Sequence, residues 1–381
     1  LLRPCAVCMQ TPVSRAPWID TLKGAACIAI VWHHLAFYGP MSDVALPLAP
    51  NLIAWLYDHA RLAVQVFLVL GGYLAASSLA PQGWVRFDSA AAQIGKRFVR
   101  LMIPLAAALA VAMAAAALVR PWLEHPSVPD APRWPQLLAH VLLLQDLVGE
   151  EALSAGVWYV AIDFQLFAGT VLVLAGVRTA LSQMPPVVQA RAVQAVVLAG
   201  VAASLFWANL QPELDVWGLY FFGAYGLGML ACWAVRSLRP AWWWGLMAAL
   251  AVAALAWDFR SRIALAAVTA LTLAVLLRQV PQWPAGAWAR GLQRVGRMSY
   301  SVFLVHFPVC LLVNAAFAQA WPTQPVPNAL GMGLAFVLSL VAGRLMFRWV
   351  EQPAPTWMQA LRWQAGMLGL GLLVLQVEAL W

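Results

Sequence analysis

Long apolar segments separated by short polar ones make up most of this chain. An α-helix needs roughly 20 apolar residues to cross a bilayer, and charges or prolines commonly bound such a segment. Ten segments of this kind are predicted, at residues 21–39, 61–80, 99–119, 156–177, 192–208, 216–235, 241–257, 262–280, 298–317 and 329–349. The pattern predicts an all-α polytopic transmembrane bundle, since a helix satisfies its own backbone hydrogen bonds in lipid.

Two further apolar segments are less regular. Residues 136–147 are too short to cross and contain His140 and Asp146, so we expect a re-entrant or interfacial helix there. Residues 364–381 are long enough to cross but rich in glycine, and the pattern leaves open an eleventh crossing. The expected organisation is a cytoplasmic segment over 1–18, a transmembrane domain over 19–353 and a tail helix over 354–381.

Composition supports a membrane protein. The chain is 63% hydrophobic and 10% charged, whereas soluble domains carry about 25% charged residues. If the N-terminus is cytoplasmic and 136–147 does not cross, most lysines and arginines fall on the cytoplasmic side, as the positive-inside rule requires. The exceptions are Arg61, Arg120, Arg133, Arg260 and Arg262. The net charge of +8 therefore reflects topology, and no nucleic-acid partner is expected.

The cysteines do not indicate a metal site. Cys5 and Cys8 form a Cys-x-x-Cys pair, but no second pair lies at zinc-binding spacing. No metal is therefore expected.

His34 is the residue that most needs an explanation. The segment Ile19–Phe37 carries Lys23 near its start and the pair His33–His34 eleven residues later. At helical rise Lys23 and His34 lie ~16 Å apart, so His34 sits near the middle of a hydrocarbon core ~30 Å thick. An ionisable side chain at that depth indicates function, and an imidazole can act as a general base near pH 7.

Other segments place small or polar residues at a similar depth. They supply Gly71 and Gly72, Asp163, and His306. Each has a structural explanation. Glycines allow close helix packing, a histidine can bond a neighbouring helix, and Asp163 is in water if the loop before it lies deeper. Their common depth instead favours one membrane-embedded site, in which Asp163 pairs with a cation such as an imidazolium. The candidate substrate-binding residues are Gly71, Gly72, Tyr73, Trp158, Tyr159, Gln165 and His306.

Basic residues gather at the cytoplasmic ends of two predicted crossings. They are Lys96, Arg97, Arg100, Arg344 and Arg348. The positive-inside rule alone predicts such residues. Arg344 is different, because it lies ~7–9 Å inside its apolar segment at helical rise. A basic entrance of this kind suits an anionic ligand from the cytosol.

Six short motifs in this order resemble those of the acyltransferase 3 family of integral membrane acyltransferases. They are Ile19–Gly24 with His34, Phe67–Tyr73, Lys96–Pro104, Trp158–Gln165, Ser299–Pro308 and Arg348–Pro353. The match extends over nearly the whole chain. The chain departs from the family pattern at Lys23 for arginine, Gly71 for serine and Asp163 for glutamate. Lysine lacks the two-pronged donor geometry of arginine, which changes how an anion is held there.

The resemblance implies an enzyme of the bacterial inner membrane. It would move an acyl group, commonly acetyl, from cytosolic acyl-CoA to a hydroxyl of a cell-envelope glycan or lipid-linked saccharide. His34 would be the catalytic base, oriented by Asp163 or His33, or would carry the acyl group itself. Lys23 and the basic residues named above would hold CoA. The same polar layer also suits a proton-coupled transporter or glycan exporter, and the oligomeric state is left open.

Overall fold

Helices form every regular element in the described part of the chain. The computed structural model describes residues 17–279 and 286–378, so the Cys5–Cys8 pair and most of the N-terminal segment lie outside the described residues. The helices are α1 (Pro17–Phe37), α2 (Pro40–Ala45), α3 (Pro50–His59), α4 (Val64–Leu79), α5 (Ala90–Val119), α6 (Trp134–Val141), α7 (Val157–Ala180), α8 (Pro186–Phe206), α9 (Gly218–Arg236), α10 (Pro240–Trp257), α11 (Ser261–Gln279), α12 (Ala287–Arg297), α13 (Ser299–Ala320), α14 (Pro325–Met346) and α15 (Trp357–Glu378). Short 3₁₀ turns lie at Leu46–Leu48, Ala60–Ala63, Pro81–Gly83, Ala208–Leu210 and Pro212–Leu214, and a π-helical turn at Phe347–Glu351.

Ten helical segments within these ranges are long and apolar enough to cross a membrane, which confirms the predicted polytopic bundle. They include nine predicted crossings and the tail helix α15. The remaining predicted crossing, α1, is not among them, because Asp20, Lys23, His33 and His34 lower its hydropathy. Polar side chains in such a helix are accommodated inside the bundle, where α1 contacts α12, α13 and α4.

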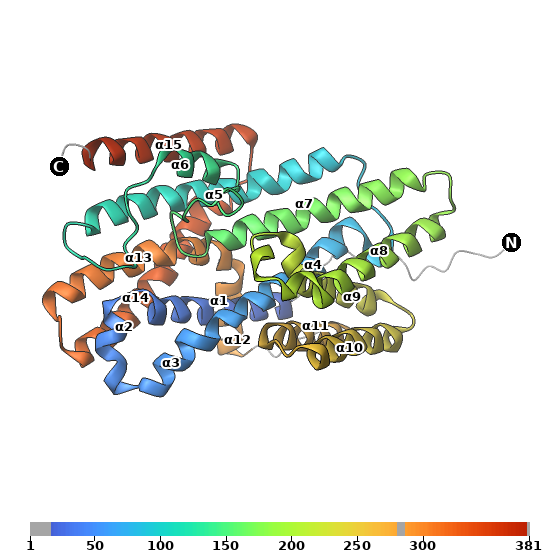
Figure 1. Cartoon of the computed structure of the whole chain (residues 1–381), viewed down its shortest axis with the longest axis horizontal. Helices are drawn as coiled ribbons and strands as arrows, with labels where there is room; N and C mark the ends of the chain where they lie inside the picture. The colour runs from blue at the N-terminus through green and yellow to red at the C-terminus, as the bar shows by residue number, and fades with distance from the viewer. Residues whose placement is uncertain (1–16, 280–285, 379–381) are drawn as a thin grey trace.

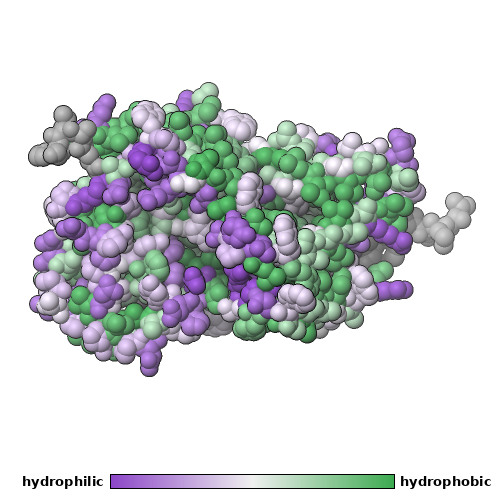
Figure 2. Space-filling model, viewed as in Figure 1, coloured by the Kyte–Doolittle hydropathy of each residue, from purple (hydrophilic) through white to green (hydrophobic). Residues whose placement is uncertain are grey.

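The helices lie side by side, and α1 is surrounded by chain segments far from it in sequence (Figure 1). Helix α5 contacts α13 and α15, and α4 contacts α9 along its length. Large apolar side chains on the outer faces remain exposed, such as Val111, Leu172 and Val341. Figure 2 shows hydrophobic residues over much of one face. An apolar surface of this extent suits a protein embedded in lipid.

Two pairs of glycines allow helices to touch through their backbones. A Cβ at Gly72 would lie 1.7 Å from the carbonyl oxygen of Tyr225, and one at Gly228 would lie 1.9 Å from that of Val69. In the second pair, a Cβ at Gly24 would lie 2.1 Å from the Leu292 oxygen, and one at Gly296 would lie 1.8 Å from that of Asp20. Gly72 therefore packs α4 against α9, which fits the structural explanation given for it above, and its substrate contact stays a prediction.

Three short helices lie between the predicted crossings and were not predicted. Helices α2 and α3 fold the segment between α1 and α4. Helix α12 carries Arg290, Arg294 and Arg297 and packs along α1. Their lengths of 6, 10 and 11 residues are too short to give a hydropathy signal for crossing.

The expected short helix at 136–147 is present as α6, and His140 anchors the segment that follows it. Nδ1–H of His140 donates to the Gln136 carbonyl at 2.7 Å, and Leu153 N–H donates to its Nε2 at 3.1 Å. Burial lowers the pKa of His140 from 6.5 to about 4. The neutral ring is thus part of the folded structure, since protonated Nε2 no longer accepts the Leu153 bond.

Acidification is therefore expected to destabilise the fold through His140. The unfolded chain binds a proton below pH 6.5, but the folded ring does so only near pH 4. Stability should fall as the pH drops through this window, by up to ~3 kcal/mol. Thermal unfolding of detergent-purified protein between pH 7.5 and 4.5 measures the effect. His140→Gln, which does not titrate, should show a smaller decrease, and an equal decrease in both proteins would assign it to other groups.

Candidate active site

Two cavities meet inside the bundle, one toward each end of α1. The His34 cavity has a volume of about 1040 Å³, and the Lys23 cavity one of about 490 Å³. Helix α1 contributes His33, His34 and Phe37 to the first cavity, and Asp20 and Lys23 to the second. A single helix therefore presents imidazoles to one cavity and an ammonium group to the other.

The imidazole of His34 is held by a second imidazole. Nδ1 of His34 lies 2.5 Å from Nε2 of His306, and their rings stack with a 4.7 Å centroid separation. Nδ1 of His306 lies 2.7 Å from the carbonyl oxygen of Phe303. Because a carbonyl only accepts, His306 carries its proton on Nδ1 and accepts at Nε2. His34 then donates from Nδ1, which leaves its Nε2 lone pair as a proton acceptor.

His33 contacts a different element. Its Nδ1 lies 3.0 Å from the Leu56 carbonyl on α3, so this nitrogen donates and Nε2 remains an acceptor. Its ring lies 5.1 Å from that of His34, centroid to centroid. Both histidines line the His34 cavity, but His34 is the one with a second imidazole behind it.

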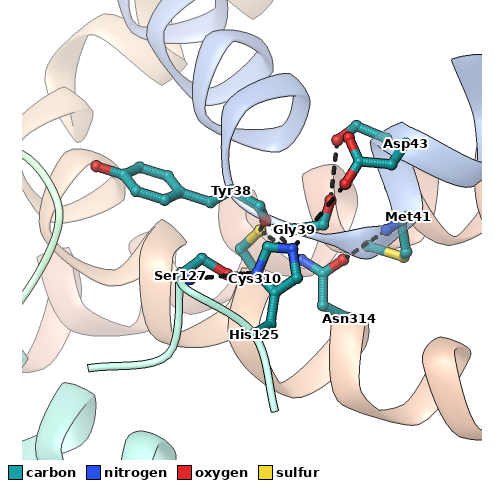
Figure 3. A network of polar contacts seen from close by, with 9 residues as sticks. Tyr38, Gly39, Met41, Asp43, His125, Ser127, Cys310 and Asn314 are labelled. Atoms are coloured by element: carbon teal, nitrogen blue, oxygen red, sulfur yellow. Dashed lines mark hydrogen bonds and ion pairs between the residues drawn. The ribbon is translucent and has the colours of Figure 1, made fainter. Parts of the chain in front are cut away.

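The end of α1 is fixed by a polar network that joins it to α13 (Figure 3). Asn314 donates to the Tyr38 carbonyl at 2.9 Å and accepts from Met41 N–H at 3.1 Å. Gly39 has φ of +143°, and a Cβ there would lie 2.3 Å from the Asn314 amide. The ring of Tyr38 points away from this network and lines the His34 cavity (Figure 3). Helix α13 thus positions α1 both through Asn314 and through His306.

The rest of the His34 cavity combines aromatic rings with charged side chains. Aromatic residues in its lining include Phe37, Tyr57, Trp158 and Phe221. Charged residues in its lining are Asp58, Arg61, Asp146, Asp215, Arg260 and Arg262. Burial raises the pKa of Asp146, which favours its neutral form. Burial likewise lowers the pKa of Arg260, whose guanidinium bonds Asn209 at 2.8 Å and the Leu205 carbonyl at 2.9 Å.

The Lys23 cavity contains three of the six basic residues that the sequence singled out. Lys23, Arg97 and Arg100 line it, and Arg297 at the end of α12 joins them. Asp20, Asp163 and Glu351 also line it. Lys96, Arg344 and Arg348 are exposed and are not among the residues that line this cavity. The sequence analysis did not single out Arg297. Its position was a usable signal, because Arg297 directly precedes the predicted crossing 298–317, which contributes Tyr300 and Phe303 to the cavity.

Asp163 pairs with Arg97 and not with an imidazole. Its Oδ2 accepts from the Arg97 guanidinium, and both side chains line the Lys23 cavity. The sequence predicts that the carboxylate of Asp163 pairs with the imidazole of His34. In the structure, α7 directs this carboxylate toward Arg97 on α5 instead. Arg97 also lies 5.3 Å above the ring of Phe167. Its Nε is buried without a hydrogen-bond partner in the described part of the chain. The group that orients His34 in this structure is therefore His306.

The remaining candidates divide between the cavities and the packing. Gly71 lines the Lys23 cavity, and Trp158 lines the His34 cavity. Tyr73 is buried beside Gly228. Gln165 donates to the Val216 carbonyl at 3.1 Å and accepts from Gly218 N–H at 2.8 Å, so it holds the start of α9. Two of the motifs meet where Ser301 bonds Glu351 at 2.5 Å.

Three residues belong to both cavities. Val64, Tyr159 and Phe303 line the His34 cavity and also the Lys23 cavity. The rings of Tyr159 and Phe303 lie 5.8 Å apart at an interplanar angle of 73°. These three side chains are therefore the wall that the two cavities have in common.

Comparison with known proteins identifies the family. Neither the curated proteins nor the solved structures contain a match to the chain. A family model described as an acyltransferase domain matches residues 16–348. The matched range includes both histidines of the His34–His306 pair and all four cations of the Lys23 cavity. The chain therefore belongs to the acyltransferase 3 family and is an integral membrane acyltransferase.

Proposed function

We propose that this protein moves an acyl group, most simply acetyl, from acyl-CoA to a hydroxyl of a cell-envelope glycan or lipid-linked saccharide. The observation that carries the proposal is the His34–His306 pair. It leaves a basic nitrogen on His34 in a cavity that shares three lining residues with a cation-lined cavity. A general base, an anionic donor and a separate acceptor chamber are the parts that such a transfer requires.

The donor occupies the Lys23 cavity. CoA carries phosphates, and Lys23, Arg97, Arg100 and Arg297 offer charged donors for them. The buried Nε of Arg97 has no hydrogen-bond partner among the described residues, so a bound anion would supply the acceptor that it lacks. In the proposed topology the N-terminus is cytoplasmic, and the Lys23 cavity opens to the cytoplasm of a bacterial inner membrane. The thioester then points along α1 toward His34.

The acceptor occupies the His34 cavity. Aromatic rings pack against the apolar faces of a sugar, and carboxylates such as Asp58 and Asp215 accept from its hydroxyls. Nε2 of His34 takes the proton of the reacting hydroxyl, whose oxygen attacks the thioester carbonyl carbon. The carbon–sulfur bond breaks, and the proton passes from His34 to the CoA thiolate. The nitrogen of His34 thereby returns to its starting state.

A covalent course through His34 is the alternative. Nε2 would attack the thioester first, and the acceptor hydroxyl would then take the acyl group from the imidazole. The two courses differ in a measurable way. A covalent course releases one equivalent of CoA per protein without acceptor, whereas direct transfer releases CoA only with acceptor.

The donor site is tested with CoA itself. CoA should raise the thermal unfolding temperature of purified full-length protein, because a ligand of the folded state stabilises it by mass action. Arg297→Gln should weaken the CoA affinity about tenfold, the value of a lost charged hydrogen bond. Lys96→Gln is the matched control, since Lys96 is exposed and lies outside the cavity lining. Equal weakening by both variants, or no shift with CoA, would contradict the proposed donor site.

A further inference from the structure

We propose that Phe303 and Tyr159 form an aromatic partition that sets the length of the acyl group the enzyme accepts. This inference rests on the proposed function, because it concerns the path of the thioester between the two cavities. It follows from the three residues that both cavities share, of which these two are the large ones.

The partition lies between the donor and the base. The Lys23 cavity on one side of it is also lined by Arg97 and Asp163, and the His34 cavity on the other side by His34 and Trp158. The ring of Tyr159 also packs 6.2 Å from that of Phe67, centroid to centroid. The ring of Tyr159 is therefore supported by another side chain. A thioester whose CoA is held in the Lys23 cavity reaches the His34 cavity only alongside the two partition rings.

Phe303 is fixed from two directions. A Cβ at Gly156 would lie 2.6 Å from Cζ of Phe303, so the ring occupies the space that any larger residue at 156 would need. Gly156 has φ of +78°, a conformation that also favours glycine. On the backbone side, the Phe303 carbonyl accepts from His306. The carbonyl of Phe303 thus sets the tautomer of the histidine pair, and its ring, held in place by Gly156, faces the acyl group.

A seated ring discriminates by size. An acetyl group adds one methyl beyond the carbonyl that the acceptor hydroxyl attacks, whereas longer chains must displace Phe303 or Tyr159. A site that excludes added methylenes typically discriminates 10–200-fold for each. The chain length accepted should therefore depend on the Phe303 side chain. The tautomer of the histidine pair depends on the Phe303 carbonyl, which a substitution retains.

The test compares acyl donors of increasing length. Membranes from cells producing the full chain are assayed for CoA release from acetyl-, butyryl- and hexanoyl-CoA, and the release by His34→Ala membranes is subtracted. Phe303→Ala is expected to raise the hexanoyl-to-acetyl ratio of kcat/KM at least about tenfold. Phe303→Leu should raise this ratio less. It replaces Phe303→Ala in the test if the alanine variant does not accumulate in the membrane.

The control removes an aromatic ring elsewhere on the same helix. Phe317 packs against Trp321 at 4.9 Å and is not among the residues lining either cavity, so Phe317→Ala should keep the wild-type ratio. An unchanged ratio in both folded Phe303 variants would overturn the partition while leaving the acyltransferase proposal intact. Absence of His34-dependent CoA release with every donor would instead refute the proposed function, and the partition with it.

Discussion

Replacing His34 with alanine is expected to lower the rate of acyl transfer by 10²–10⁴-fold, the usual contribution of a general base. The reason is the position of Nε2, which is fixed by the contact between Nδ1 of His34 and His306. His33 lines the same cavity, but its Nδ1 is bonded to Leu56 and no second imidazole orients it. His33→Ala should therefore reduce the rate far less. Transfer of radiolabelled acetyl from acetyl-CoA to membrane material measures both.

His306 is a positioning residue in this scheme, and its role is separable from a structural one. His306→Leu removes the acceptor that holds the His34 tautomer, so kcat should fall and the pH–rate profile should shift. His306→Gln supplies a carbonyl that can accept from Nδ1 of His34, and it should restore part of the activity. Wild-type rates of transfer by His34→Ala would exclude the base mechanism. If both His306 variants had the pH–rate profile of the wild type, His306 would have no positioning role.

Replacing Asp163 with alanine is expected to destabilise the protein by about 3 kcal/mol, because it leaves the partly buried Arg97 guanidinium without its carboxylate. The side chains of Arg97 and Asp163 are 30% and 10% exposed, so the cost falls at the lower end for breaking a buried ion pair. Denaturant unfolding in detergent measures the loss.

The double variant distinguishes a structural pair from a catalytic carboxylate. Asp163→Ala combined with Arg97→Ala should be more stable than the sum of the single variants predicts, since the two residues contact each other. Thermal unfolding with CoA should also show weaker binding in every variant that lacks Arg97. A fully stable but inactive Asp163→Ala protein would instead return Asp163 to the catalytic role that the sequence suggested.

The sequence predicted the helices that cross the bilayer because hydropathy is a property of single segments. It did not predict α3 or α12, which are short and acquire their positions by packing on α1. Glycine at position 72 shows the same limit, since only the approach of α9 shows which backbone it contacts. The role of Arg297 depends likewise on where α12 lies.

Depth along a helix was predictable, but direction around it was not. The rise per residue placed His34 and His306 in one layer, and the structure brings their rings into contact. The same reasoning placed Asp163 near that layer, yet its partner is Arg97. Each residue turns the helix axis by ~100°, so a side chain's neighbours depend on which helices surround it. Sequence alone carries no such information about neighbours.

Helix α1 also fixes the distance between the ammonium group of Lys23 and the imidazole of His34. Lys23 and His34 lie on one uninterrupted helix whose backbone touches α12 at Gly24 and Gly296, so their spacing is fixed by helical geometry. Inserting one alanine between them would lengthen the span by only ~1.5 Å but rotate the imidazole by ~100° relative to the ammonium. The distance between Lys23 and His34 therefore cannot change by a single residue without also turning the imidazole away from its present direction relative to the ammonium group.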